Sequence, residues 1–262
     1  MSWKSDSLPL AISHRGGAGL WPENTMEAFS RTVAMGYRWI ETDLHVTEDG
    51  MVVCLHDPTL ERTTDGRGEV AELSWKEVRD LDAGYRHHPN QGYPFRGQGV
   101  CIPSLEEVAD SFPDLCMVLE LKADHTEEPL LRLIRRMRLE DRVIVASFSD
   151  DRLARVRSLS KGDVAISTGE EEVARIVKAA WLGRRVDTRN EALQIPPRSG
   201  LAPLVTRRTV RAYHRMGLQV HVWTINQPRH MERLLDRGVD GIMTDRPDLL
   251  RDVFMKRGIW GK

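Results

Sequence analysis

One stretch of the sequence decides the fold: residues 40–57, which read IETDLHVTEDGMVVCLHD. The apolar runs on either side of Asp49-Gly50 predict two strands joined by a tight hairpin turn. A turn this short cannot join parallel neighbours, because a parallel connection needs a dozen or more residues. The second strand is therefore expected to run antiparallel to the first and to lie outside any parallel sheet built by the rest of the chain.

Polar side chains of this hairpin are expected to converge. Alternate residues of a strand share one face, so Glu41 and Asp43 point the same way. With the turn centred as above, the returning strand brings His56 level with Thr42 and Asp43. His45 falls two residues beyond Asp43, and we interpret it as a supporting residue. The pattern predicts two acids and a histidine at one site, with an ordinary surface hairpin as the alternative.

Outside the returning strand, apolar runs alternate with segments of helical periodicity. The expected strands lie at residues 10–13, 38–47, 117–122, 143–148, 164–166, 192–195, 220–225 and 241–245. Eight strands, each linked to the next by helical sequence, predict an α/β fold of the (β/α)8 TIM-barrel type. A doubly wound open sheet is the structural alternative, but no glycine-rich dinucleotide turn follows the first strand.

Two further features depart from or refine this alternation. The segment at about 58–103 is rich in Gly, Pro, Arg and Asp, and we interpret it as an insertion within a single domain of residues 1–262. The capping box Ser74-x-x-Glu77 predicts one short helix inside it. After the first strand, Asn24 is expected to cap a helix, with Glu27 reaching back to its backbone.

Length and composition limit what the protein can be. The 262 residues suffice for one barrel, and a formal net charge of −1 argues against nucleic acid as the main partner. We expect no signal peptide and no membrane span, and therefore membrane contact that is peripheral at most, with the tail at 256–262 as the candidate. Three cysteines without metal-ligand spacing predict buried free thiols in a reducing, cytoplasmic compartment. Formation of a homo-oligomer is left open.

Barrel active sites lie at the carboxyl ends of the strands, and acidic residues gather there in this sequence. Glu41, Asp43 and Glu120 are three carboxylates expected to converge without histidine or cysteine ligands. Such a set suits a hard divalent cation, Mg²⁺ or Ca²⁺. Without a cation the three groups would repel, and at least one would have to stay protonated.

Positive charge and two histidines complete the predicted site. Arg15 and Lys122 offer fixed charge for an anion, and a guanidinium suits phosphate oxygens. His14 and His56 titrate near neutrality and are suited to act as general base and general acid. Together with a metal, these groups describe phosphoryl transfer. Trp223 at the end of the seventh strand could stack on a substrate or belong to the core.

The sequence resembles the glycerophosphodiester phosphodiesterase family over about residues 9–250, with the order and spacing of the motifs preserved. The motifs that carry the resemblance are His14-Arg15-Gly16, Pro22-Glu23-Asn24-Thr25, Glu41-Thr42-Asp43, His56-Asp57, Arg62-Thr63-Thr64, Ile102-Pro103-Ser104-Leu105, Glu120-Leu121-Lys122, Ser147-Phe148, Trp223-Thr224-Ile225-Asn226, Gly238-Val239-Asp240-Gly241 and Thr244-Asp245-Arg246-Pro247.

This resemblance implies a TIM barrel with an insertion after His56, and hydrolysis of a glycerophosphodiester to glycerol 3-phosphate and an alcohol with a divalent cation. In similar enzymes the substrate's own 2-hydroxyl attacks, and water opens the resulting cyclic phosphate. The implied roles are metal ligation by Glu41, Asp43 and Glu120, acid–base catalysis by His14 and His56, and phosphate stabilisation by Arg15 and Lys122. The segments 193–196 and 221–224 also resemble members that cleave lysophospholipids, a lysophospholipase D reaction.

Two other classes of function are weighed against this one. A metal-dependent sugar isomerase on the same barrel would also use acids and a metal, but it would not need paired histidines together with Arg15 and Lys122. A non-catalytic barrel that acts as a binding or scaffold protein would be favoured by the loss of a site residue, and none is lost.

Overall fold

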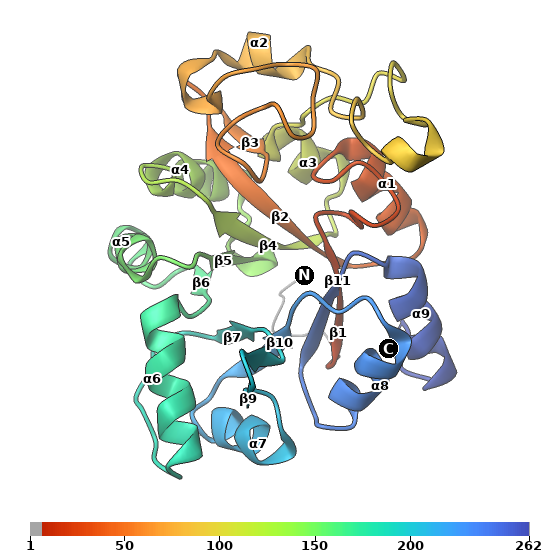
Figure 1. Cartoon of the computed structure of the whole chain (residues 1–262). Coiled ribbons are helices and arrows are strands. Elements are labelled where there is room, and N and C mark those ends of the chain that lie inside the picture. Colours follow the sequence, from red (N-terminus) through yellow and green to blue (C-terminus); the bar gives the residue numbers. More distant parts are fainter. Residues whose placement is uncertain (1–6, 262) are drawn as a thin grey trace.

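Parallel strands form a barrel that is surrounded by helices (Figure 1), in a computed structural model that describes residues 7–261. The barrel strands are β1 (Leu10–His14), β2 (Trp39–Val46), β4 (Cys116–Leu121), β5 (Val143–Ala146), β6 (Ala165–Ile166), β7 (Ala192–Ile195), β10 (Gln219–Val222) and β11 (Gly241–Thr244). They are ordered β6-β5-β4-β2-β1-β11-β10-β7. A parallel bridge between Ser167 and Ala192 joins the two ends of this order. The predicted TIM barrel is confirmed.

Helices cover the outside of the barrel, and apolar side chains fill its inside. Ile12, Trp39, Val118, Ile144 and Met243 belong to the cluster within the strands. Such layers of side chains make a packed core rather than a pore. The helices are α1 (Met26–Ala34), α3 (Leu105–Ser111), α4 (Glu127–Met137), α5 (Asp150–Ser160), α6 (Glu170–Trp181), α7 (Arg207–Arg215), α8 (Pro228–Leu235) and α9 (Pro247–Lys256), with the short turn η4 (Glu140–Arg142) before β5.

The hairpin is formed as expected. Strand β3 (Val52–Cys54) pairs antiparallel with β2, with Leu44 opposite Cys54. The Leu55 amide continues this pairing by donating to the Asp43 carbonyl at 3.0 Å. Continuing the same register places His56 opposite Thr42, at the carboxyl end of the barrel.

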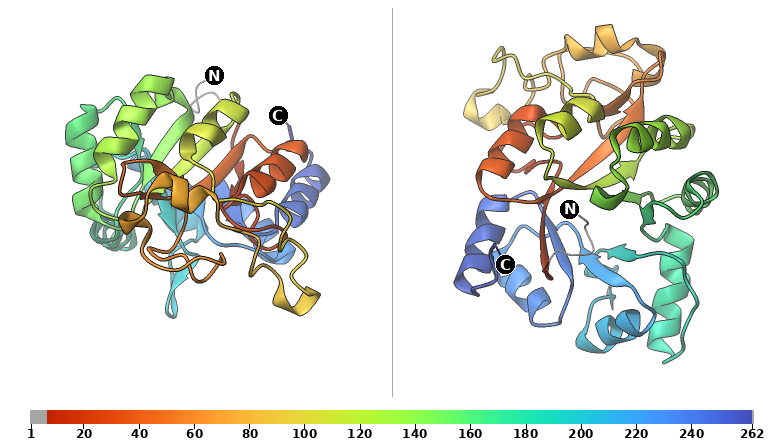
Figure 2. Two further views of the ribbon diagram at one scale, coloured as in Figure 1. Left: turned by 90° about the horizontal axis from the view of Figure 1, so that it is seen from above. Right: turned by 180° about the vertical axis from the view of Figure 1, so that it is seen from behind.

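The segment between β3 and α3 packs as a cap beside that end of the barrel (Figure 2). It contains η2 (Val70–Glu72), α2 (Trp75–Arg79) and η3 (Pro89–Gln91). The predicted capping box is present, because Glu77 accepts hydrogen bonds from both the amide and the hydroxyl of Ser74. Apolar residues of the segment form a cluster with Val53 of β3. The members of this cluster are Val53, Leu55, Leu60, Val70, Val78, Ala83, Val100 and Ile102.

One local expectation is wrong, and one local element was not predicted. Thr25, not Asn24, caps α1, and its hydroxyl accepts from the Ala28 amide at 3.2 Å. Asn24 instead has a left-handed backbone with φ of 56°, which turns its side chain toward β2. A short hairpin of β8 (Arg198–Ser199) and β9 (Ala202–Pro203), which the sequence pattern did not predict, lies between β7 and α7.

Two further observations bear on the compartment and the membrane. The three cysteines are free thiols, and Cys101 is exposed rather than buried as expected. In the tail, the Trp260 ring packs edge-on against Tyr37 with ring centroids 4.9 Å apart, while Lys262 lies outside the described residues. Among the residues that the structure describes, no helix has the length and hydropathy needed to cross a bilayer.

Gly16 is predicted to be a position where any side chain is costly. Its φ is 77°, and an added Cβ would lie 2.7 Å from Phe29 Cδ1 and 2.8 Å from Ala28 Cβ. Gly16→Ala should therefore cost roughly 1–2 kcal/mol of backbone strain and roughly 1–3 kcal/mol more from overpacking. Gly50→Ala is the control, because Gly50 has a φ of 85° but open space around it. Equal losses in the free energy of urea unfolding would contradict the prediction.

Candidate active site

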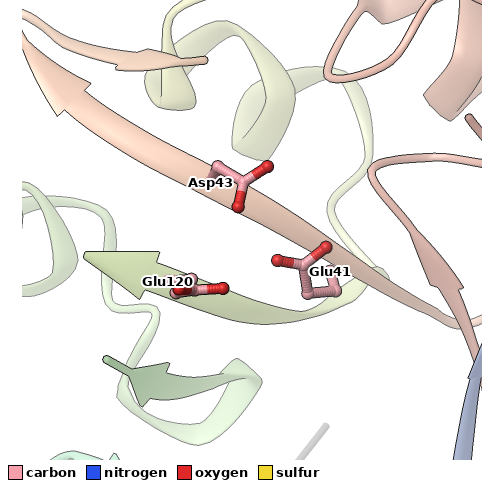
Figure 3. Close-up of side chains that lie close together, drawn as sticks. All are labelled: Glu41, Asp43 and Glu120. Carbon is pink, nitrogen blue, oxygen red and sulfur yellow. The ribbon is translucent and has the colours of Figure 1, made fainter. Parts of the chain in front are cut away.

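The register of three neighbouring strands brings the predicted acids together. His14 on β1 is aligned with Glu41 on β2, and Asp43 on β2 is aligned with Glu120 on β4. One ligand oxygen from each of Glu41, Asp43 and Glu120 lies within 4.8 Å of the others. Figure 3 shows the three carboxylates gathered between β2 and β4. The predicted convergence of the acids is therefore present in the structure.

The chemistry of this acidic cluster fits a divalent cation. Glu41 is only 3% exposed, and its Oε1 has no hydrogen-bond partner among the described residues. Burial and the adjacent Asp43 charge raise the pKa of Glu41 to about 8. A buried carboxyl that resists ionisation lacks compensating positive charge. A hard cation held by Glu41, Asp43 and Glu120 would supply that charge, and all the donors are oxygens that Mg²⁺ and Ca²⁺ prefer.

Asp43 is the member of the cluster that the protein itself compensates. Lys122 Nζ lies 3.0 Å from one of its oxygens and 2.7 Å from Glu120 Oε1. Arg15 Nε lies 3.0 Å from the other oxygen, and Asn24 Nδ2 donates to the same atom at 2.8 Å. Burial alone would raise the pKa of Asp43, but the Arg15 and Lys122 charges outweigh burial and lower it. Asp43 is therefore held as a carboxylate.

His14 is oriented by a carboxylate from the last barrel strand. Its Nδ1 lies 2.6 Å from Asp245 Oδ1, and Asn226 Nδ2 donates to the other Asp245 oxygen at 2.8 Å. Burial raises the pKa of Asp245, but His14, Asn226 and Arg15 together outweigh burial and the net pKa is lowered. An ionised Asp245 accepts, so His14 carries a proton on Nδ1. Its Nε2 then faces the acidic cluster, 3.8 Å from Glu41 Oε2.

His56, which lines the same pocket, has a matching contact with a neighbouring carboxylate. Its Nδ1 lies 2.6 Å from Asp57 Oδ1. His45 Nε2 contacts the His56 carbonyl oxygen at 3.1 Å, which is the supporting position expected for His45. Each of the two predicted histidines therefore has one ring nitrogen tied to a carboxylate and the other available.

An ion-pair network connects His56 to Arg15. Arg62 pairs with Asp57 and, through two nitrogens, with the two oxygens of Glu23 at 2.7 and 2.9 Å. Arg15 Nη1 donates to Glu23 Oε1 at 3.0 Å. The network ties the loop after the hairpin to the loop after β1, so the two sides of the site are held at a fixed separation.

The site opens into a pocket of about 840 Å³ with two chemically different ends. His14, Arg15, Glu41 and Lys122 belong to the polar end. Beyond them, Trp223 meets Phe148 edge-on, with ring centroids 5.7 Å apart. The rest of the lining includes the charged Glu170 and Lys178 of α6 together with an apolar arm, which we define by Val173, Ala174, Val177, Trp181, Ile195 and Leu204.

The predicted site residues all lie in this region. His14, Arg15, Glu41, His56, Glu120, Lys122 and Trp223 line the pocket. Asp43 is fully buried between Arg15 and Lys122. Sequence reasoning gave no site role to five residues whose side chains orient the predicted ones, Glu23, Asn24, Asp57, Asn226 and Asp245. The available indication was that each lies within a motif that also carries the family resemblance.

Comparisons with known proteins identify the family to which the sequence and fold are similar. Residues 14–249 match the Glycerophosphoryl diester phosphodiesterase family. The chain is 37% identical to the probable glycerophosphodiester phosphodiesterase 2 of Mycobacterium tuberculosis, over 96% of this chain and 92% of that protein. It is 27% identical to the mouse lysophospholipase D GDPD1, over 95% of this chain and 87% of that protein. The chain also superimposes on an Oleispira antarctica phosphodiesterase that was solved with its product sn-glycerol-3-phosphate. The TM-score is 0.75 at 25% identity, over 95% of this chain and 97% of that chain.

Cation binding is predicted to stabilise the fold more as pH rises. Because the pKa of Glu41 is raised from 4.5 to about 8, the proton it binds stabilises the cation-free fold, and that contribution is lost as pH rises from 4.5 through about 8. A saturating cation replaces the proton, so its effect on the melting temperature should be larger at about pH 9 than at about pH 6.

The matched variants for this measurement are Glu41→Gln and Glu48→Gln. Glu41→Gln should lose most of the cation-induced shift in melting temperature, whereas Glu48→Gln changes an exposed residue of the same hairpin and should keep it. A shift that is the same at both pH values would contradict the prediction.

Proposed function

Because the chain belongs to the glycerophosphoryl diester phosphodiesterase family, and is an enzyme of that class, we propose that it hydrolyses its substrate by metal-dependent histidine acid–base catalysis. The products would be sn-glycerol 3-phosphate and an alcohol. Glu41, Asp43 and Glu120 would hold Mg²⁺ or Ca²⁺. A bound cation would act as a Lewis acid and offset negative charge on the phosphoryl oxygens.

The observation that carries this proposal is the pair of histidine–aspartate contacts in the pocket that Glu41 and Glu120 also line. With Nδ1 fixed by Asp245 or Asp57, each histidine presents Nε2 to the pocket. One Nε2 would take the proton from the attacking hydroxyl, and the other would give a proton to the oxygen of the leaving alcohol. The two histidines would then exchange protonation states, so that water can complete the hydrolysis.

Arg15 and Lys122 would bind the phosphate. Both line the pocket beside the cluster, and their pKa values are raised because Asp43 and its neighbours outweigh the effect of burial. Both therefore stay charged at neutral pH. Positive charge fixed in advance stabilises a phosphoryl group that gains charge in the transition state. The Trp223 ring, at the junction of the two pocket ends, would contact the substrate beyond the phosphate.

The apolar arm favours a second candidate substrate, a lysophospholipid cleaved in a lysophospholipase D reaction. The pocket volume of about 840 Å³ lies near the upper end of the roughly 300–1,000 Å³ of small-molecule sites. Glycerol 3-phosphate with a small head group would leave the apolar arm unfilled. A single acyl chain would bury the side chains of the apolar arm, with a gain of roughly 0.8 kcal/mol per buried methylene.

Replacing either histidine is predicted to slow turnover strongly. His14→Asn and His56→Asn should each lower kcat on glycerophosphocholine by at least about a hundredfold, the size expected when a general acid or base is lost. His125→Asn is the control, because His125 is exposed outside the pocket and has a left-handed backbone that asparagine tolerates. Unchanged turnover in both site variants would refute the assignment.

A charge in the apolar arm is predicted to separate the two substrates. Ala174 lines the pocket from α6 yet is exposed, so Ala174→Asp should leave the core intact. We expect KM for lysophosphatidylcholine to rise about tenfold or more, since a carboxylate must be desolvated against the acyl chain, with little change for glycerophosphocholine. Ala154→Asp on α5 is the matched control. No hydrolysis of lysophosphatidylcholine by the wild type would rule out the second candidate.

A further inference from the structure

Residues 181–240 carry a local excess of positive charge. Residues 181–240 contain eleven arginines, no lysine and only five acidic residues, although the whole chain has a formal net charge of −1. Two of those acids are already paired outside the segment, since Glu232 and Asp236 both bind Arg257 at 2.9 and 2.7 Å. The segment therefore presents uncompensated positive charge.

Large apolar side chains are exposed in the same region. The hairpin of β8 and β9 projects from the side of the barrel that carries the insertion (Figure 2, left). Leu201 at its tip is 93% exposed, and Trp181 and Leu182 at the end of α6 are 45% and 58% exposed. Trp181 lines the substrate pocket together with Ser199 and Ala202 of the hairpin. Trp181 and the hairpin that carries Leu201 therefore both border that pocket.

A second, smaller pocket of about 270 Å³ lies at the base of the same hairpin. Arg198, His230, Arg233 and Arg237 line it, and no carboxylate does. Burial, with the neighbouring Arg233 and Arg198 charges, lowers the pKa of Arg237. A pocket lined by three arginines and no carboxylate favours an anion, and a guanidinium matches phosphate oxygens.

We propose that this face docks on an anionic phospholipid bilayer, with Leu201 inserted and the pocket of Arg198, Arg233 and Arg237 bound to a lipid phosphate. Basic residues next to exposed aliphatic and aromatic side chains are the combination that peripheral proteins use at a membrane surface. A nucleic acid would satisfy the arginines but would leave Leu201 and Leu182 exposed to water. Docking in this orientation would also point the mouth of the substrate pocket toward the lipid.

The test is flotation with vesicles made of equal parts phosphatidylglycerol and phosphatidylcholine, compared with vesicles of phosphatidylcholine alone. Wild type should bind the anionic vesicles, and added salt should weaken the binding. Leu201→Asp should weaken it by about tenfold or more, and Arg198→Gln and Arg233→Gln by about fivefold each. The readout needs no turnover, so its failure is separate from a failure of the proposed catalysis.

Matched variants keep the result interpretable. Leu8→Asp changes an exposed leucine just before β1, at the amino end of the barrel, and Arg132→Gln changes an exposed arginine on α4; both should bind as wild type does. Melting temperatures should show that each variant is folded. The proposal is overturned if anionic vesicles do not bind, if Leu201→Asp binds as wild type does, or if RNA binds through Arg198 and Arg233 while vesicles do not.

Discussion

The burial of three carboxylates at one end of the barrel is the constraint on which the site depends. The parallel register of β1, β2 and β4 holds the carboxylates of Glu41, Asp43 and Glu120 close together. Like charges at this separation are tolerated only with nearby positive charge or a bound proton. Arg15 and Lys122 compensate Asp43, but His14 and Arg15 compensate Glu41 only in part, and its pKa is raised to about 8. The protein is thus built to accept one further positive charge at this point.

The same constraint explains why the site requires the whole barrel. His14 is oriented by Asp245, which follows the last strand, β11, and β11 pairs with β1 where the barrel closes on itself. His56 is oriented by Asp57, which is local, but Arg62 and Glu23 tie that carboxylate to the loop after β1. One histidine therefore depends on closure of the barrel, and the other depends on docking of the insertion.

Much of the fold and the site could be predicted from the sequence because both rest on short-range patterns. Apolar runs mark the barrel strands, and the two-residue spacing of Glu41 and Asp43 fixes their shared face. Asn24 was wrongly predicted to cap α1 because Asn24 and Thr25 are adjacent and both are suitable helix-capping residues. The structure shows that Thr25 is the cap and that the Asn24 side chain binds Asp43 instead. The hairpin of β8 and β9 was missed because strands of two residues carry no periodicity.

The two ends of the pocket belong to different halves of the barrel, and this division connects the chemistry to the surface. The predicted charged site residues come from the ends of β1, β2 and β4, whereas the apolar arm comes from α6, β7 and the segment before α7, with Glu170 and Lys178 of α6 beside it. That second half also carries the exposed Leu201 and the arginines of the smaller pocket. An apolar moiety leaving a bilayer at the hairpin would meet the apolar arm first and the acidic cluster last. The phosphodiester would then arrive between the two histidines with its apolar part already buried.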